Sequence, residues 1–220
     1  MIQIRINEKL YLKDPESSKL GRGIVEHGIK LIDELGFEHF TFKKLAAEIN
    51  STEASIYRYF ENKHKLLIYL VSWYWNWLDY QLMFSTNNIF DLKERLRIAF
   101  KIVTRPHDFS DFIHIDKEAL HRIVVSESPK AYLSKEVDEI NSEGAFLSYK
   151  RVCRNIANIA KQINPDYPYP TALISTAVES AHHQKFFSLH LPSLTEISRG
   201  DDEEILDYLV DMIFRVLKCS

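Results

Sequence analysis

The stretch that decides the fold runs from residue 41 to residue 67 and reads TFKKLAAEIN STEASIYRYF ENKHKLL. Thr41 and Thr52 each stand before a short apolar pattern of helical period, and a hydroxyl side chain at that place favours the start of a helix. Asn50 separates the two patterns, and asparagine tolerates a left-handed backbone better than most residues. The stretch therefore predicts two short helices joined by a tight turn.

The small and apolar residues of this stretch fit the packing of a helix-turn-helix. Such a unit needs a small residue where its second helix meets its third, and Ala46 supplies one. It also needs an apolar residue on the inner face of the third helix, and Ile56 supplies that. The steps of four residues from Ala46 to Asn50 and six from Asn50 to Ile56 match the motif. Many helical hairpins share these steps, so spacing alone does not identify a DNA-binding domain.

Helical patterns continue on both sides of the stretch. Before it, apolar residues recur at three- and four-residue steps over residues 18–35, with a serine pair to cap the start and Gly36 to end the helix. After it, Asn62 stands where it can cap a long helix over residues 63–85. This long helix carries too many aromatic residues for a single stripe, so we expect it to be contacted on more than one side.

The rest of the chain is also helical in pattern, which makes the predicted fold all-α with about nine helices. We predict an N-terminal arm over residues 1–16, a helix-turn-helix domain over 17–65 and a larger helical domain over 66–220. The arm alternates apolar and polar residues like a short strand but finds no partner strand, and we expect it to be mobile. Further helices are predicted over 91–104, 116–126, 129–163 with a bend at Gly144, 171–190 and 202–218, with three prolines breaking the pattern at 164–170.

The composition excludes several classes of protein. The 220 residues are 45% hydrophobic and 27% charged, an ordinary globular composition that argues against global disorder. Two cysteines cannot form a disulfide framework. The most apolar stretch, residues 66–78, is too short for a bilayer, which needs about 20 residues. A net charge of -3 excludes a chain that is polybasic throughout. We expect a soluble cytoplasmic protein without a cofactor.

The deciding stretch is nevertheless basic. Residues 41–65 carry five cationic side chains and three glutamates, a charge of +2 within a chain of -3. Phosphate contacts from such cations give affinity and register, whereas contacts with base edges select the sequence. A local basic surface of this kind is compatible with DNA binding. The cations are Lys43, Lys44, Arg58, Lys63 and Lys65, and the glutamates are Glu48, Glu53 and Glu61.

A more specific signal lies in Gly36-Phe37, Thr41, Leu45-Ala46, Ser55 to Phe60 and Asn62 to Leu67. This combination resembles the tetracycline-repressor (TetR) family of transcriptional regulators. The match covers about 50 residues, roughly a quarter of the chain. The remaining three quarters resemble the family only in length and helical pattern. The resemblance implies a sequence-specific DNA-binding regulator rather than an enzyme, usually a repressor, which a small-molecule effector releases from its operator.

The resemblance places the third helix, residues 52–60, in the major groove of DNA. It also makes Lys63 the match of the family's phosphate-clamping lysine. Glu53 departs from the family pattern, because a basic or small residue is common there. A carboxylate at this place either accepts a hydrogen bond from cytosine N4 or lowers non-specific affinity, and the sequence leaves both open. The predicted DNA-binding residues are Thr41, Lys43, Lys44, Thr52, Glu53, Ser55, Tyr57, Arg58, Tyr59 and Lys63.

The resemblance further implies that the larger helical domain binds an effector and forms a homodimer. A two-fold dimer implies a near-palindromic operator, and effector binding is expected to shift the long helix over 63–85. Aromatic rings with polar atoms suit a ligand pocket, and the candidates are Trp73, Trp77, Phe100, His121, Phe146, Tyr149 and His182. The last two helices carry the candidate dimer residues Ala177, Val178, Ala181, Leu206, Leu209, Val210, Ile213 and Leu217.

Two other functions fit parts of the sequence. Glu118 with His121, and Glu179 with His182, form two Glu-x-x-His pairs on predicted helices. Two such pairs on facing helices are typical of a di-iron carboxylate site in a helical bundle, although they also arise by chance at this content of glutamate and histidine. The second alternative is a protein of the same fold that binds a ligand and no longer binds DNA.

Overall fold

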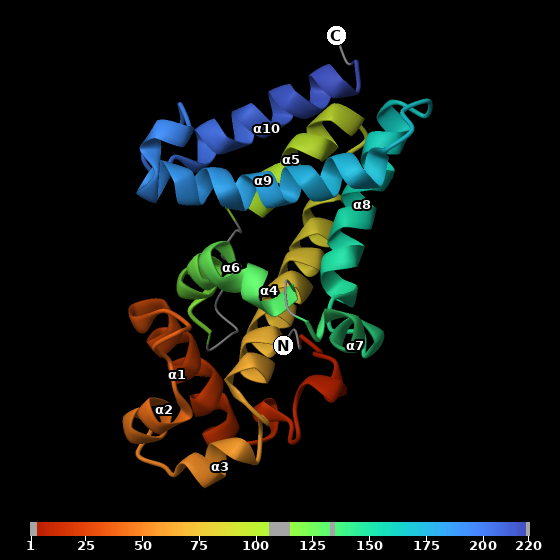
Figure 1. Ribbon diagram of the computed structural model, residues 1–220. Helices are drawn as coiled ribbons and strands as arrows, with labels where there is room; N and C mark the ends of the chain where they lie inside the picture. The colour runs from red at the N-terminus through yellow and green to blue at the C-terminus, as the bar shows by residue number, and fades with distance from the viewer. Residues whose placement is uncertain (1–3, 106–114, 133–134, 219–220) are drawn as a thin grey trace. The chain divides into compact units, whose positions relative to one another are not determined.

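A computed structural model describes residues 4–105, 115–132 and 135–218. Over these residues it holds ten α-helices, three short 3-10 helices and no strand (Figure 1), which confirms the all-α class. None of the helices described is both long and apolar enough to cross a membrane. The helices are α1 (Lys19–Leu35), α2 (Phe42–Glu48), α3 (Glu53–Tyr57), α4 (Lys63–Thr86), α5 (Leu92–Thr104), α6 (Lys117–Tyr132), α7 (Val137–Ser142), α8 (Leu147–Ile163), α9 (Pro170–His190) and α10 (Asp202–Val216), with the 3-10 helices η1 (Glu8–Leu10), η2 (Pro15–Ser17) and η3 (Pro192–Leu194).

The chain divides into two compact units. The first holds Met1–Asn76 and Asp108–Leu147, and the second holds Trp77–His107 and Ser148–Ser220. The domain boundary predicted at residue 66 differs from this division, because the first half of α4 belongs to the first unit together with α6 and α7. The first unit is therefore larger than a helix-turn-helix alone.

Helix caps begin and end the first helices where the sequence predicts. Ser18 Oγ accepts a hydrogen bond from Gly21 N at 3.0 Å at the start of α1. Gly36 ends that helix with a φ of 75°, and Asn50 has the predicted left-handed conformation with a φ of 51°. Both are therefore positions where the backbone needs a residue that tolerates positive φ. The core beneath these helices consists of Ile24, Phe40, Leu45, Ile56 and Phe60, all fully buried.

Helix α4 is surrounded by other elements in the first unit. Every side chain from Leu66 to Val71 is buried, which confirms that the helix is contacted on more than one side. Its first turn is capped by Asn62, whose Oδ1 accepts from Lys65 N at 2.8 Å. The buried Ser72 hydroxyl donates to the Ala145 carbonyl at 2.8 Å, so the polar group inside this apolar stretch is satisfied.

Helix α6 packs on α1 and is hydrogen-bonded to the loop that follows α1. Glu127 Oε1 accepts a hydrogen bond from Phe37 N at 3.1 Å. On the exposed side of the same contact, Arg122 Nη2 lies 2.7 Å from Asp33 Oδ2. These bonds explain why α6 belongs to the same compact unit as the helix-turn-helix.

Two helix boundaries differ from the prediction. Helix α6 continues through Pro129 to Tyr132, whereas the sequence pattern indicates an end near Ser126. A proline removes one backbone donor, and the last turn is supported by a 2.8 Å hydrogen bond between the Ser128 and Tyr132 hydroxyls. The predicted bend at Gly144 is a full break between α7 and α8, with a φ of 88°.

Residues 4–17 are hydrogen-bonded to other parts of the first unit. Leu12 N donates to the Tyr59 carbonyl at 2.8 Å, and Asn7 Nδ2 donates to the Glu143 carbonyl at 2.6 Å. The prediction of a mobile arm is therefore wrong for these residues. The alternating pattern gave no sign of these contacts, because neither a backbone amide nor a polar Asn7 side chain changes the apolar periodicity.

In the second unit, α10 packs against α5 and α9. An exposed ion pair between Arg97 and Asp207, 2.8 Å apart, joins α5 to α10. Asp79 of α4 is 8% exposed, and its carboxylate accepts from Arg151 Nε at 2.7 Å and from Asn155 Nδ2 at 3.1 Å. This nearly buried carboxylate is therefore paired and hydrogen-bonded, as burial of a charge requires.

Two glycines of α1 offer a matched test of the docked N-terminal segment. A Cβ on Gly21 would collide with the Pro15 carbonyl, whereas a Cβ on Gly23 would meet nothing within 4 Å. Gly23→Ala should stabilise the helix by about 0.5–1 kcal/mol. Gly21→Ala should destabilise the fold by about 1–3 kcal/mol, because η2 must move away. Urea unfolding measures both, and equal effects of the two substitutions would contradict the docking of η2.

Candidate nucleic-acid interface

The turn between α2 and α3 is fixed by short-range hydrogen bonds. Thr41 caps α2 and Thr52 caps α3, and each hydroxyl accepts from the backbone N–H three residues later at 3.2 Å. Within the turn, Ser51 N donates to the Ala46 carbonyl at 2.8 Å. This bond requires the chain to reverse at Asn50, and the positive φ of that residue provides the reversal.

Helix α3 buries one face and exposes the other. Ile56 is fully buried beneath it, whereas Glu53 and Arg58 are exposed and Tyr57 is 48% exposed. The Tyr57 ring stands edge-on to the Phe42 ring of α2, with 5.1 Å between the ring centroids. This contact holds the Tyr57 ring at the surface, on the same exposed face as Arg58 and Glu53.

Most of the predicted DNA-binding residues lie on the surface of this unit. Within the part of the chain that the structure describes, Lys43 and Arg58 make no hydrogen bond or ion pair, so their charges are available to a partner. Lys44 Nζ donates to the His39 carbonyl at 2.8 Å. Ser55 is half-buried, and its hydroxyl is hydrogen-bonded to that of the Thr52 cap at 2.9 Å. The exposed members of the set are Thr41, Lys43, Lys44, Thr52, Glu53, Tyr57 and Arg58.

The surface is more basic than the sequence count suggests. Lys30 Nζ of α1 lies 2.8 Å from Glu48 Oε1 at the end of α2. The hydrogen bond from Lys30 lowers the pKa of Glu48 below its usual range and keeps it ionised and paired. Sequence reasoning missed Lys30, because it lies in another helix and no spacing rule connects the two residues.

Tyr59 is a correction to the predicted set. It is 3% exposed, and its hydroxyl is hydrogen-bonded to Ser18 Oγ at 2.8 Å. Lys13 Nζ lies 5.1 Å from the centroid of its ring. Tyr59 therefore faces α1 and the N-terminal segment and cannot reach base edges. Sequence reasoning missed Lys13, because it treated residues 1–16 as a separate arm, and it gave Ser18 only the role of a helix cap.

Lys63 makes internal contacts that the sequence did not predict, and its contact with DNA stays a prediction. Its Nζ donates to the carbonyls of Phe37, Glu38 and Phe40 at 2.9, 3.1 and 3.2 Å, and it lies 4.7 Å from the Phe37 ring centroid. An ammonium group has three protons, and all three are used inside the chain. Lys63 therefore holds the loop between α1 and α2 in this structure, and a phosphate contact would have to break one of these bonds.

The candidate pocket residues are divided between the two units. The first unit holds Trp73, His121 and Phe146, and the second holds Trp77, Phe100, Tyr149 and His182. The Tyr74 hydroxyl is hydrogen-bonded to His121 Nδ1 at 2.8 Å, and Tyr149 donates to Glu179 Oε1 at 2.5 Å. Burial lowers the pKa of His182 to about 4, so its imidazole is neutral at pH 7. The effector pocket stays a prediction.

The candidate dimer residues are buried within a single chain. All eight are at most 9% exposed, because α5, α9 and α10 pack on one another. A side chain that its own chain covers has little area left for a partner, so these apolar faces mark the core of the second unit instead. The eight are Ala177, Val178, Ala181, Leu206, Leu209, Val210, Ile213 and Leu217, and exposed apolar side chains on the same helices are Leu189, Tyr208 and Val216.

The arrangement of the Glu-x-x-His pairs does not favour a metal site. Glu118 is exposed, and its partner histidine is hydrogen-bonded to a tyrosine. The two pairs also belong to different compact units. Among the described residues, no three histidine, cysteine, aspartate or glutamate side chains come together as metal ligands require.

A short capped helix with an exposed polar face, set on a second helix by a tight turn, defines a helix-turn-helix DNA-binding protein. Residues 24–70 match the family described as "Bacterial regulatory proteins, tetR family". This match identifies residues 24–70 as a DNA-binding domain of the tetR type. The chain is also similar to the negative transcriptional regulator IcaR of the biofilm operon icaADBC in Staphylococcus aureus (strain Newman), with 25% identity over 125 residues, which covers 50% of this chain and 67% of that protein.

Solved structures show the same fold over most of the chain. AibR in complex with isovaleryl coenzyme A and operator DNA has a TM-score of 0.55 and 21% identity, covering 88% of this chain and 97% of that one. A putative transcriptional regulator from Saccharomonospora viridis in complex with choline has a TM-score of 0.61 and 16% identity, covering 89% of this chain and 96% of that one. The likeness therefore extends beyond the helix-turn-helix into the second unit.

A comparison of Lys63 with Lys43 tests whether Lys63 stabilises the fold. Lys63→Ala should lower the free energy of unfolding by about 1–3 kcal/mol, because three carbonyls lose a charged donor. Lys43→Ala should change it by less than about 0.5 kcal/mol, because that side chain is exposed and makes no bond. Chemical unfolding of both variants provides the measurement. Equal stability of the two would mean that Lys63 does not hold the loop.

Proposed function

We propose that the protein is a transcriptional repressor that binds a near-palindromic operator and is released by a small-molecule effector. The observation that carries DNA binding is the turn at Asn50, which sets α3 on α2 with Ile56 buried and with Tyr57 and Arg58 exposed. A helix held in this way can place its side chains against base edges in the major groove. Negative regulation by the similar IcaR supports repression rather than activation. A cytoplasmic location is part of the proposal, because the protein must be in the same compartment as its operator.

A homodimer is part of this proposal. Two copies related by a two-fold axis bring two α3 helices to half-sites about 34 Å apart, one turn of DNA. The contact is expected on exposed side chains of α9 and α10, such as Leu189, Tyr208 and Val216, because the predicted apolar faces are already covered. An operator of two inverted half-sites follows from this symmetry.

Glu53 is proposed to limit which operator sequences the protein binds. Its carboxylate is exposed at the start of α3, on the same short helix as Tyr57 and near Arg58. Like charge repels it from phosphates, but it can accept a hydrogen bond from cytosine N4. We therefore propose that Glu53 accepts a hydrogen bond from a cytosine. Its negative charge then weakens binding to DNA of any sequence, while the hydrogen bond favours sites that carry the cytosine.

The effector is proposed to act through α4 and α6. Helix α4 carries residues of both compact units, and its first residue, Lys63, holds the loop between α1 and α2. Helix α6 is bonded to the same loop, because the Phe37 amide donates to Glu127. The similar structures that contain isovaleryl coenzyme A and choline support an effector without fixing its chemistry for this chain. A ligand changes DNA affinity only if it binds the two conformations unequally.

Selection from a pool of random DNA duplexes tests the proposed operator binding. The wild-type protein should enrich inverted repeats. Arg58→Ala should weaken binding to the selected site by about 1–3 kcal/mol and relax one base position, whereas Lys43→Gln should weaken all sites and reduce the salt slope by about one. Lys161→Gln, at an exposed lysine of the second unit, is the matched control. Failure of the wild type to enrich any sequence would reject the proposal.

A pair of substitutions at Glu127 tests the role of α6. Glu127→Ala leaves the buried Phe37 amide without an acceptor, whereas Glu127→Gln keeps an acceptor and loses only the ion pair with Lys130. The alanine variant should bind the selected operator at least about fivefold more weakly than the glutamine variant. DNA titration measures the difference. Equal affinities would show that α6 does not control the DNA-binding surface.

A further inference from the structure

Residues of the N-terminal segment hold the chain at the point where α3 ends. The Tyr59 carbonyl comes after the last helical residue, where backbone acceptors need partners from outside the helix, and it accepts from Leu12 N at 2.8 Å. The Tyr59 hydroxyl is hydrogen-bonded to Ser18 Oγ at 2.8 Å, and Lys13 Nζ lies 5.1 Å from the ring centroid. Arg58, which directly precedes this tyrosine, is one of the exposed residues proposed to contact DNA. A shift of Tyr59 would therefore move Arg58 as well.

The other end of the same segment is bonded to the end of α7. Asn7 Nδ2 donates to the Glu143 carbonyl at 2.6 Å, and the Glu143 carboxylate lies 3.1 Å from Lys65 Nζ of α4. Gly144 follows with a φ of 88°, and a Cβ there would lie only 3.0 Å from Asn7 Nδ2. The missing side chain thus leaves room for the Asn7 amide. Asn7 is bonded to the chain shortly before it enters the second unit at Ser148.

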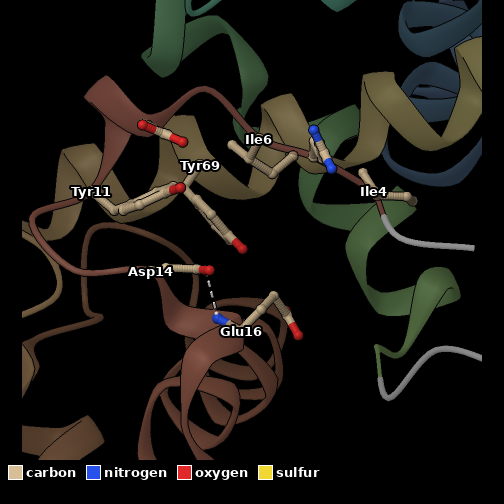
Figure 2. Close-up of a pocket in the computed structure, with 8 residues that line it drawn as sticks. Ile4, Ile6, Tyr11, Asp14, Glu16 and Tyr69 are labelled. Atoms are coloured by element: carbon tan, nitrogen blue, oxygen red, sulfur yellow. Dashed lines mark hydrogen bonds between the residues drawn. The ribbon is translucent and has the colours of Figure 1, made fainter.

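Between these two bonds the segment is fixed along its length. Asn7 Oδ1 caps η1 by accepting from Lys9 N at 3.0 Å, and Leu10, at the end of η1, is 1% exposed. Figure 2 shows Tyr11 beside Tyr69 of α4, and the two rings stand edge to face with 6.1 Å between their centroids. Rigid, packed elements of this kind carry a displacement from one end to the other, as a disordered segment does not.

We propose that residues 7–12 form a strap that holds α3 in the position needed to read bases, with Asn7 as a positioning residue. This inference rests on the proposed function. Lys63 and Glu127 hold the loop before α2, whereas the strap holds the opposite end of the helix-turn-helix, just after Arg58. The strap is therefore a separate connection between α3 and the rest of the first unit.

The strap is expected to affect base reading more than general attraction to DNA. Contacts with base edges need side chains held within about 0.5 Å, whereas attraction to phosphates depends mainly on charge. Displacement of Glu143 reaches Tyr59 through the strap and misplaces Arg58, while the charge of the surface stays the same. Loss of a strap bond should therefore weaken binding to the operator and leave binding to unrelated DNA unchanged.

Operator binding by the full chain with Asn7→Ser tests the proposal. Serine keeps an oxygen that caps a helix start, but it has no amide to reach the Glu143 carbonyl, and the charge of the chain is unchanged. Affinity for the operator selected from random duplexes should fall at least about threefold, and affinity for an unrelated duplex of equal length should change by less than about 1.5-fold. Asn88→Ser, at an exposed asparagine of the second unit, is the matched control and should bind both duplexes as the wild type does.

Leu12→Pro releases the other end of the strap, because proline has no N–H to donate to the Tyr59 carbonyl. It should weaken operator binding at least as much as Asn7→Ser does. The two substitutions together should weaken it no further than Leu12→Pro alone, since a strap released at one end no longer acts. Hydrogen exchange gives a measurement without DNA: in Asn7→Ser, the amides of residues 55–60 should exchange at least about threefold faster, whereas those of α10 should not change.

Four results would each overturn the strap: operator affinity of Asn7→Ser equal to that of the wild type, an equal loss on both duplexes, independent effects of the two substitutions, or unchanged exchange at residues 55–60. Circular dichroism verifies the fold of each variant, and if Leu12→Pro is unfolded, Asn7→Ser and its hydrogen exchange decide. A wild type that selects an operator which Asn7→Ser binds equally well rejects the strap alone. A wild type that selects no operator rejects the proposed function and the strap with it.

Discussion

The proposed DNA-binding surface depends on the burial of Ile56 beneath α3. That helix has five residues, and isolated helices shorter than about 12–15 residues are marginal in water. Fully burying a side chain of this size stabilises the fold by about 1.5–3 kcal/mol, more than the roughly 1 kcal/mol of the Thr52 cap. The core therefore holds the helix in place, with the cap and the Asn50 turn setting its direction. Any change in that core moves Tyr57 and Arg58 as well.

The support for this surface reaches far along the chain. Lys63 holds the loop before α2 by three carbonyls, and Glu127 bonds the same loop through the Phe37 amide. Leu12 bonds the Tyr59 carbonyl just beyond α3. Because these contacts come from α4, α6 and the N-terminal segment, the compact unit is larger than three helices. A change in α4 or α6 can thus reach α3 through these contacts.

Short-range features were predictable from the sequence, and longer-range ones were not. The caps at Ser18, Thr41 and Thr52 and the positive φ at Asn50 depend on a few adjacent residues, so each left a local signal. Periodicity shows which face of a helix is covered but not what covers it. The faces of α9 and α10 were therefore assigned to a partner, although α5 covers them within the chain. Likewise, nothing near Lys63 in the sequence indicates that its ammonium group is used by carbonyls more than 20 residues earlier.

Charge separates two surfaces of the first unit. The α2–α3 surface presents Lys43 and Arg58 without internal partners, while Lys30 pairs with Glu48 and removes one negative charge from it. The surface lined by residues 4–16 and Tyr69 holds the carboxylates of Glu8, Asp14 and Glu16 beside Arg5. DNA is attracted to the first surface and repelled from the second, and such fields act over about 10 Å at moderate salt. The orientation of the unit on a duplex is therefore favoured by charge before any base is read, which explains how a chain with a net charge of -3 can still bind DNA.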